Sequence, residues 1–273
     1  GTMGNAAIYL NPEAYDTGGS SLMGRHSAGE SFLRGYIRHA KAERFHFWNV
    51  AESPLETMNA FITKVQPTDK PITWLGRGNR GGLREPGVVY IPTPNLPKQA
   101  AWRLPFGQTA YGLCGVTHTT ASHDIMDMIG NLLIAPIEPW DALICTSAAV
   151  RASTEAQLEA TAEYLSKRLG VTRPNTPLIE TIPLGINAEE FSFSEESRRK
   201  WRAELDIPED AIVALYVGRF NVLAKMNPVP MALAMEAAAD LARPEGLILT
   251  TDVLIAQAPQ AAQAAQVGID AKP

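Results

Sequence analysis

The sequence has few cysteines, no long apolar run and no excess of positive charge. Its 273 residues include two cysteines, Cys114 and Cys145, which excludes a disulfide scaffold and favours a reducing compartment. No run reaches the roughly 18 apolar residues that a membrane-spanning helix needs. There are 24 lysines and arginines against 29 aspartates and glutamates, a formal net charge of −5, whereas nucleic-acid binders are normally basic. We therefore expect a cytoplasmic protein without a transmembrane segment that does not bind nucleic acid.

A dinucleotide-binding fingerprint is absent in spite of one partial match. Residues 76–81 read GRGNRG and fit G-x-G-x-x-G. The motif requires a helix directly after it to hold the pyrophosphate, and the LREPG that follows cannot begin one. An oxidoreductase with a nicotinamide or flavin cofactor is therefore disfavoured. We interpret the segment as a basic loop in which Arg77, Arg80 and Arg84 are candidates to touch an anionic group of an acceptor.

Metal-binding and hydrolase motifs are missing as well. His118 and His123 are five residues apart and fit no H-x-x-x-H register, so we expect no metal site. Neither a G-x-S-x-G segment nor a phosphate-binding P-loop occurs. Both cysteines lie in strand-like apolar runs, where free cysteine usually serves as a small core residue.

Strand-like and helix-like segments alternate over about 180 residues. This alternation predicts an α/β domain with a Rossmann-like parallel sheet covered by helices on both faces. The predicted strands are 6–10, 45–50, 72–75, 88–91, 113–116, 142–145 and 178–182, and the predicted helices are 24–40, 54–64, about 124–133, and the segment from Ser147, as N-cap, to Leu169.

Ligands of such sheets bind beyond the carboxyl ends of the strands. The residues just after the strands are therefore candidates, and among them His118 follows the strand 113–116. A histidine there is either a hydrogen-bonded structural residue or a ligand-binding one. Gly115 and the polar run 117–120 strengthen the second interpretation.

The β–loop–α pattern restarts in the last third of the chain. A charged helix is predicted at 194–205 with Ser194 as its N-cap, followed by a strand at 211–217 and a helix at 228–242. We predict a first domain at residues 1–183, an interdomain linker at 184–193, and a partial second Rossmann-like domain at 194–273.

Several stretches resemble one enzyme family. LIETIPLGINAEEF at 178–191 and RAELDIPEDAIVALYVGRF, which begins at 202, resemble the interdomain junction and first donor-domain unit of glycosyltransferase family 4, retaining enzymes of the GT-B fold. In the acceptor-side, N-terminal domain of that family, the last strand and the helix after it are similar to WDALICTSAAVR at 140–151, and a strand end of the form G-x-x-H-[ST] is similar to GVTHTT at 115–120. The loop containing Gly18 and Gly19 is similar to its glycine loop.

The resemblance implies an enzyme that moves a sugar from a nucleotide-diphosphate sugar to a glycan or small-molecule acceptor, with no cofactor and no metal. It implies that His118 is a catalytic residue near the sugar. It also implies that Arg219 and Lys225 bind the donor phosphates, where charge grows as the glycosidic bond breaks. Gly18 and Gly19 would allow close backbone approach to donor or acceptor.

The sequence departs from the family in two respects. Arg219 and Lys225 are six residues apart instead of five, and the family's E-x7-E segment, which contacts the donor sugar, is absent. We therefore expect this truncated chain to bind nucleotide sugars weakly or not at all and to transfer nothing. The alternative hypothesis is a non-catalytic Rossmann-like module that binds a glycan or a partner.

Overall fold

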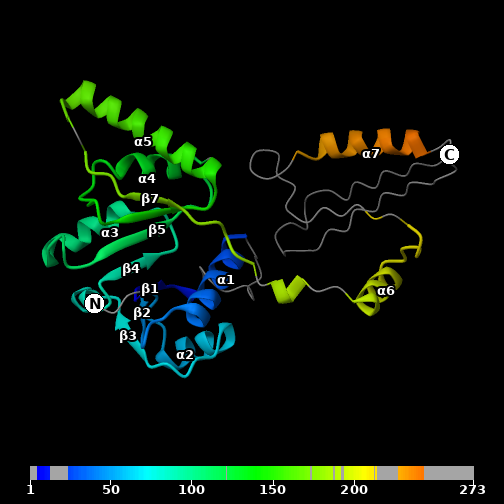
Figure 1. The fold of residues 1–273 in the computed structure, drawn as a ribbon, viewed down its shortest axis with the longest axis horizontal. Helices are drawn as coiled ribbons and strands as arrows, with labels where there is room; N and C mark the ends of the chain where they lie inside the picture. The colour runs from blue at the N-terminus through cyan, green and yellow to red at the C-terminus, as the bar shows by residue number, and fades with distance from the viewer. Residues whose placement is uncertain are drawn as a thin grey trace. The chain divides into compact units, whose positions relative to one another are not determined.

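Seven parallel strands form an open sheet in the computed structural model, running from β3 at the bottom of Figure 1 to β7 near the top. The structure describes residues 5–12, 24–120, 122–172, 174–186, 188–191, 194–211, 213 and 227–242. The strands are β1 (Ala7–Leu10), β2 (Phe45–Asn49), β3 (Ile72–Gly76), β4 (Val88–Ile91), β5 (Gly112–Val116), β6 (Ala142–Cys145) and β7 (Leu178–Thr181). They are ordered β3-β2-β1-β4-β5-β6-β7, and every neighbouring pair is parallel. The predicted Rossmann-like α/β fold is confirmed.

Helices cover both faces of this sheet. They are α1 (Gly24–His39), α2 (Leu55–Val65), α3 (Leu96–Arg103), α4 (His123–Asn131) and α5 (Ala148–Leu169), with short 3-10 helices η2 (Gly81–Arg84) and η3 (Leu104–Phe106). Residues of α1 and α2 pack into one hydrophobic cluster, and residues of α3, α4 and α5 pack into another. None of the helices in the described ranges is long and apolar enough to cross a lipid bilayer.

The side-chain alternation of the strands creates the two clusters. In β2, Phe45 and Phe47 pack with α1 and α2, whereas Trp48 belongs to the cluster on the opposite face. In β1, Ala7 and Ile8 divide in the same way. Successive side chains of a strand point to opposite faces, so a strand that is covered on both sides is apolar at nearly every position.

The predicted start of the longest helix is confirmed in detail. The side chain of Ser147 accepts a hydrogen bond from the Val150 amide at 3.1 Å, so it caps α5. The helix ends at Gly170, whose φ of 70° lies in the left-handed region that glycine adopts without strain.

The chain divides into two compact units, Gly1–Asn187 and Ala188–Pro273. In the second unit, the described elements are η4 (Ala188–Phe191), α6 (Glu195–Glu204) and α7 (Pro228–Ala242). Ser194 caps α6, as predicted, by accepting a hydrogen bond from the Ser197 amide at 3.0 Å. The strand predicted at 211–217 lies almost entirely outside the described residues.

Helix α3 and the short 3-10 helices η2, η3 and η4 were not predicted from the sequence. Helix α3 was not expected between the strands 88–91 and 113–116, and a short 3-10 helix, η2, forms where only a loop was predicted. The buried face of α3 consists of Leu96, Gln99, Ala100 and Arg103. Their spacing is helical, but two of the four side chains are polar, so no apolar periodicity reveals the helix.

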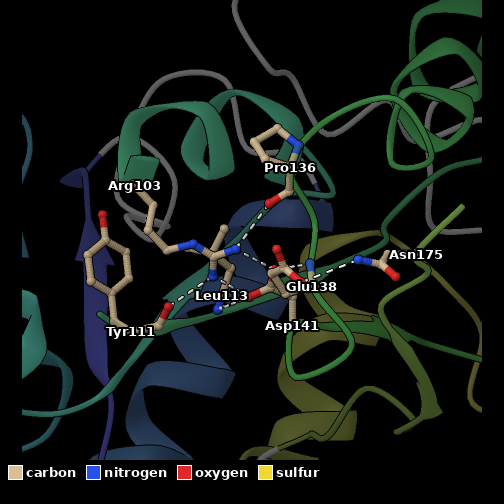
Figure 2. A network of polar contacts seen from close by, with 7 residues as sticks. All are labelled: Arg103, Tyr111, Leu113, Pro136, Glu138, Asp141 and Asn175. Atoms are coloured by element: carbon tan, nitrogen blue, oxygen red, sulfur yellow. Dashed lines mark hydrogen bonds and ion pairs between the residues drawn. The ribbon is translucent and has the colours of Figure 1, made fainter. Parts of the chain in front are cut away.

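The last residue of α3 takes part in a fully buried ion pair. Figure 2 shows Arg103 facing Asp141, which directly precedes β6. Both side chains have no exposed area, and two parallel contacts join them, Nη1 to Oδ1 at 2.6 Å and Nη2 to Oδ2 at 2.8 Å. Nη1 also donates to the Tyr111 carbonyl at 2.9 Å, and Nη2 donates to that of Pro136 at 3.2 Å. A buried ion pair requires this geometry, since the desolvation of each charge must be offset.

Asp141 also fixes the beginnings of two neighbouring strands. Its Oδ1 accepts a hydrogen bond from the Leu113 amide of β5 at 2.8 Å, and its Oδ2 accepts one from the Glu138 amide at 2.9 Å. Its backbone carbonyl accepts from the Leu178 amide at the start of β7 at 2.7 Å. One residue therefore connects α3, β5, β6 and β7 at the amino ends of the strands.

We predict that Asp141→Asn lowers the free energy of unfolding by about 3 kcal/mol. The substitution keeps the shape of the side chain but leaves the Arg103 charge buried and uncompensated, and breaking a buried pair typically costs 3–5 kcal/mol. Urea denaturation followed by circular dichroism measures the change.

Glu163→Gln is the matched control, because Glu163 pairs with Lys167 on the exposed side of α5. Its effect should stay below about 1 kcal/mol. Equal effects of the two substitutions would show that the buried pair does not organise the sheet.

Candidate functional site

The carboxyl ends of the parallel strands lie along one edge of the sheet. Along the sheet, the chain order reverses between β1 and β4, and the crevice at such a reversal is where open α/β sheets bind ligands. The loop after β1 begins at Asn11, and the loop after β4 contains residues 92–95. His118 follows β5, the strand next to β4. This edge is therefore the candidate site.

His118 lies two residues beyond the end of β5 and is half-buried. Its Nε2 atom is 3.0 Å from the carbonyl oxygen of Pro92, in the loop after β4. A carbonyl can only accept, so Nε2 carries the proton of this hydrogen bond. The preceding residue, Thr117, is fully buried, and its amide and hydroxyl donate to the Ile144 carbonyl at 2.9 and 3.2 Å. The neighbouring strands thus hold the imidazole at the edge of the sheet.

Gly115 explains how the loop after β4 comes so close to β5. A Cβ atom at this position would lie 2.8 Å from the Thr93 carbonyl oxygen and 2.9 Å from Cδ2 of Leu96. The Val116 amide donates to the same Thr93 oxygen at 3.3 Å. The glycine and the histidine of the sequence GVTH therefore act together, because the missing side chain lets the loop approach and the loop then holds the imidazole through Pro92.

Four of the predicted site residues lie outside the described residues. In the sequence, Gly18 and Gly19 fall between β1 and α1, and Arg219 and Lys225 fall within the second unit. Their roles as glycine loop and phosphate-binding pair stay predictions. The same holds for the catalytic role of His118, although its position is now known.

The basic loop after β3 contributes to a different feature. Arg77 and Arg80 line an open hollow of about 470 Å³ together with Glu52, Gly78 and Trp102, which we name the Arg80–Trp102 hollow. Arg84 is held elsewhere, since its Nη2 donates to the Phe106 carbonyl at 2.6 Å. Trp102 was not among the predicted site residues because it lies on α3, the helix that the sequence pattern did not reveal.

The histidine and carboxylates near the start of α4 form an exposed pair. Nε2 of His123 lies 3.6 Å from Oδ2 of Asp127, with the two side chains 88% and 64% exposed. Within the described ranges, no group of three or more histidines, cysteines, aspartates and glutamates is placed to hold a metal ion. The pair is therefore a solvated surface contact of little energetic weight.

The two cysteines lie in β5 and β6, as predicted. Burial raises the pKa of the Cys114 thiol to about 11, and it also raises the pKa of Cys145, which is fully buried. The thiolate is the nucleophilic form. Neither side chain is therefore suited to act as a nucleophile near neutral pH.

Comparisons of the chain with protein-family models, with curated proteins and with solved structures find no match. The fold and the geometry of the strand ends are therefore the observations from which a function is inferred, together with the sequence resemblance stated above.

We predict that Gly115→Ala destabilises the protein by about 1–3 kcal/mol. The added methyl group would press against a backbone oxygen and a packed leucine, and such overpacking typically costs this amount. Gly35→Ala is the control. Gly35 lies within α1 with no atom within 4 Å of the added Cβ, so this substitution should stabilise by about 0.5–1 kcal/mol. Urea denaturation of both variants measures the two changes in the free energy of unfolding, which should have opposite signs. Destabilisation by both substitutions would contradict the prediction.

We predict that stability falls as the pH rises from 9 to 11, in part because of Cys114. Its pKa is raised from 9.0 to about 11 in the folded chain, so the folded state holds the thiol proton after the unfolded state has lost it. This contribution is fully present below pH 9 and is lost as the pH rises through the folded value. Unfolding free energies at pH 9, 10 and 11 should therefore fall less steeply in Cys114→Ala. If the unfolding free energy falls equally steeply with pH in both proteins, Cys114 does not contribute to the pH dependence.

Proposed function

We propose that this chain contributes the acceptor-side domain of a retaining glycosyltransferase, which moves a sugar from a nucleotide-diphosphate sugar to a glycan or small-molecule acceptor. The observation that carries the proposal is the position of His118. It lies at the carboxyl edge of an open parallel sheet, one strand away from the reversal between β1 and β4, where such sheets bind ligands. The segments similar to glycosyltransferase family 4 supply the reaction class.

The environment of His118 suits the recognition of a sugar. The hydrogen bond to Pro92 fixes the plane of the imidazole, and a fixed polar group loses little conformational entropy when it binds a hydroxyl. Thr119 and Thr120 follow His118 directly, and the β4 loop contains Thr93 and Asn95. Hydroxyl and amide side chains of this kind both donate and accept hydrogen bonds, as sugar hydroxyls require.

The transfer step breaks the bond between the sugar and the diphosphate, and the leaving group takes up negative charge. Positively charged side chains next to the phosphates stabilise this charge in the transition state. In the proposal, Arg219 and Lys225 supply it, and the protein needs no metal ion for this purpose. His118 acts on the sugar side of the bond, where it orients the ring by hydrogen bonding.

We predict that nucleotide-diphosphate sugars shift the imidazole NMR signals of His118. The chain has five histidines, so protein labelled with ¹⁵N-histidine gives a small set of signals, and His118→Gln assigns the one of interest. Titration with UDP-glucose and GDP-mannose to several millimolar should move this signal saturably. We expect dissociation constants in the millimolar range, which correspond to about −4 kcal/mol.

His123 provides the internal control, because it lies five residues away with an imidazole that is 88% exposed. Its signal should not move. The proposal is wrong if a donor binds without shifting the His118 signal, or if the signals of His118 and His123 shift equally, as a non-specific effect of the added ligand would produce.

A further inference from the structure

The Arg80–Trp102 hollow is a second polar feature of the first unit, separate from the contacts of His118. Its lining residues come from three segments: Glu52 follows β2, Arg77 to Arg80 follow β3, and Trp102 lies on α3. The hollow thus combines two guanidinium groups, one carboxylate and a large aromatic side chain.

Arg80 is held in place by aromatic contacts. Its guanidinium carbon is 4.2 Å from the ring centroid of Trp102 and 5.5 Å from that of Trp48. Trp48 is itself fixed, since it is buried and its Nε1 lies within hydrogen-bond distance of the Gly76 and Arg77 carbonyls. The Nε atom of Arg80 is buried without a hydrogen-bond partner. Stacking on aromatic faces orients a guanidinium, so the group is ordered before any ligand arrives.

The charges around the hollow do not balance. Within the described part of the chain, Arg80 makes no ion pair, and Lys98 lies against the same indole, with Nζ 4.7 Å from the centroid of Trp102. Arg77 faces Glu52 at 3.6 Å, and both side chains are about two-thirds exposed, 64% and 65%. The lining of the hollow therefore carries two cations against one carboxylate, a net positive charge, in a chain whose overall formal charge is −5.

We propose that the Arg80–Trp102 hollow binds a phosphate dianion, either as a phosphate monoester of a small molecule or as free phosphate. A guanidinium offers parallel N–H donors that match phosphate oxygens. A phosphate monoester carries nearly two negative charges at neutral pH, so a net positive lining attracts it more strongly than a carboxylate, which carries one. In the proposed glycosyltransferase, the phosphate would belong to the acceptor. Only this assignment to the acceptor rests on the proposed function, and the binding of phosphate itself does not.

Removing the negative charge of Glu52 should increase the affinity for phosphate, which makes this residue a specific test of the proposal. Its carboxylate competes with an incoming anion for Arg77 and adds a negative charge to the lining. Because the pair is exposed, Glu52 contributes little to stability. Glu52→Gln should therefore leave the fold unchanged and tighten phosphate binding, an effect that a purely structural arginine cluster would not show.

The test is calorimetric titration of the whole chain with glucose 6-phosphate, inorganic phosphate and glucose, at low ionic strength because salt screens exposed charges. Glucose 6-phosphate should bind saturably and glucose should not. Tighter binding of glucose 6-phosphate than of inorganic phosphate identifies a monoester site, and equal binding identifies a site for free phosphate. Arg80→Gln should weaken the binding about tenfold, as expected for the loss of a charge-assisted contact, and Glu52→Gln should strengthen it about threefold.

Arg151→Gln is the matched control, because Arg151 is an arginine on α5 paired with Glu155, and it should leave the affinity unchanged. Circular dichroism establishes whether each variant is folded. If Arg80→Gln does not fold, the increase in affinity expected for Glu52→Gln still tests the proposal. The proposal is overturned if neither phosphate compound binds at millimolar concentration, or if glucose binds as well as glucose 6-phosphate. It is also overturned if Glu52→Gln does not tighten binding. These results do not involve His118, so a failure here is distinguishable from a failure of the glycosyltransferase proposal.

Discussion

The buried ion pair between Arg103 and Asp141 determines how the second half of the sheet is assembled. Two charges without any exposed area are stable only if each is almost fully satisfied. Here the carboxylate accepts from the guanidinium and from two backbone amides, and the guanidinium donates to two further carbonyls. The pair stabilises one particular arrangement of α3, β5 and β6, because any other arrangement would leave a charge without partners in the protein interior.

The candidate site depends on this arrangement through β5. The Leu113 amide is bound to Asp141 at one end of the strand, and His118 follows the other end. Between them, Gly115 admits the loop after β4, and that loop supplies the Pro92 carbonyl that holds the imidazole. The position of a polar side chain at the carboxyl edge is therefore set by a short parallel strand whose start is fixed by a buried carboxylate.

The sequence predicts most of the sheet because its strands are short apolar runs separated by clear helical segments. All seven strands of the sheet were found, with ends that differ by at most one residue. Helix α3 was missed because Gln99 and Arg103 occupy its buried face, and their burial depends on tertiary partners that local periodicity does not reveal. The partner of Arg103 is 38 residues away in the sequence, and no spacing rule connects the two.

In the candidate site, too, the sequence predicts the local features but not the tertiary contacts. The sequence identified His118 from its place after a strand and from the nearby glycine, both of which are local features. It did not identify the contact with Pro92, nor the tryptophan that orients Arg80, since Trp102 reaches the β3 loop only through the missed helix. It grouped Arg84 with Arg77 and Arg80, whereas the structure ties Arg84 to the Phe106 carbonyl. Gly18, Gly19, Arg219 and Lys225 stay predictions from the family resemblance.

In the proposed function, His118 lies next to the transferred sugar at the carboxyl edge of the sheet. The most direct measurement is an experimental structure of the whole chain soaked with a nucleotide-diphosphate sugar at millimolar concentration. We predict density for the sugar ring within hydrogen-bond distance of the His118 imidazole, beside the loop after β4. A donor bound elsewhere on the molecule, with the contacts of His118 unchanged, would contradict the account.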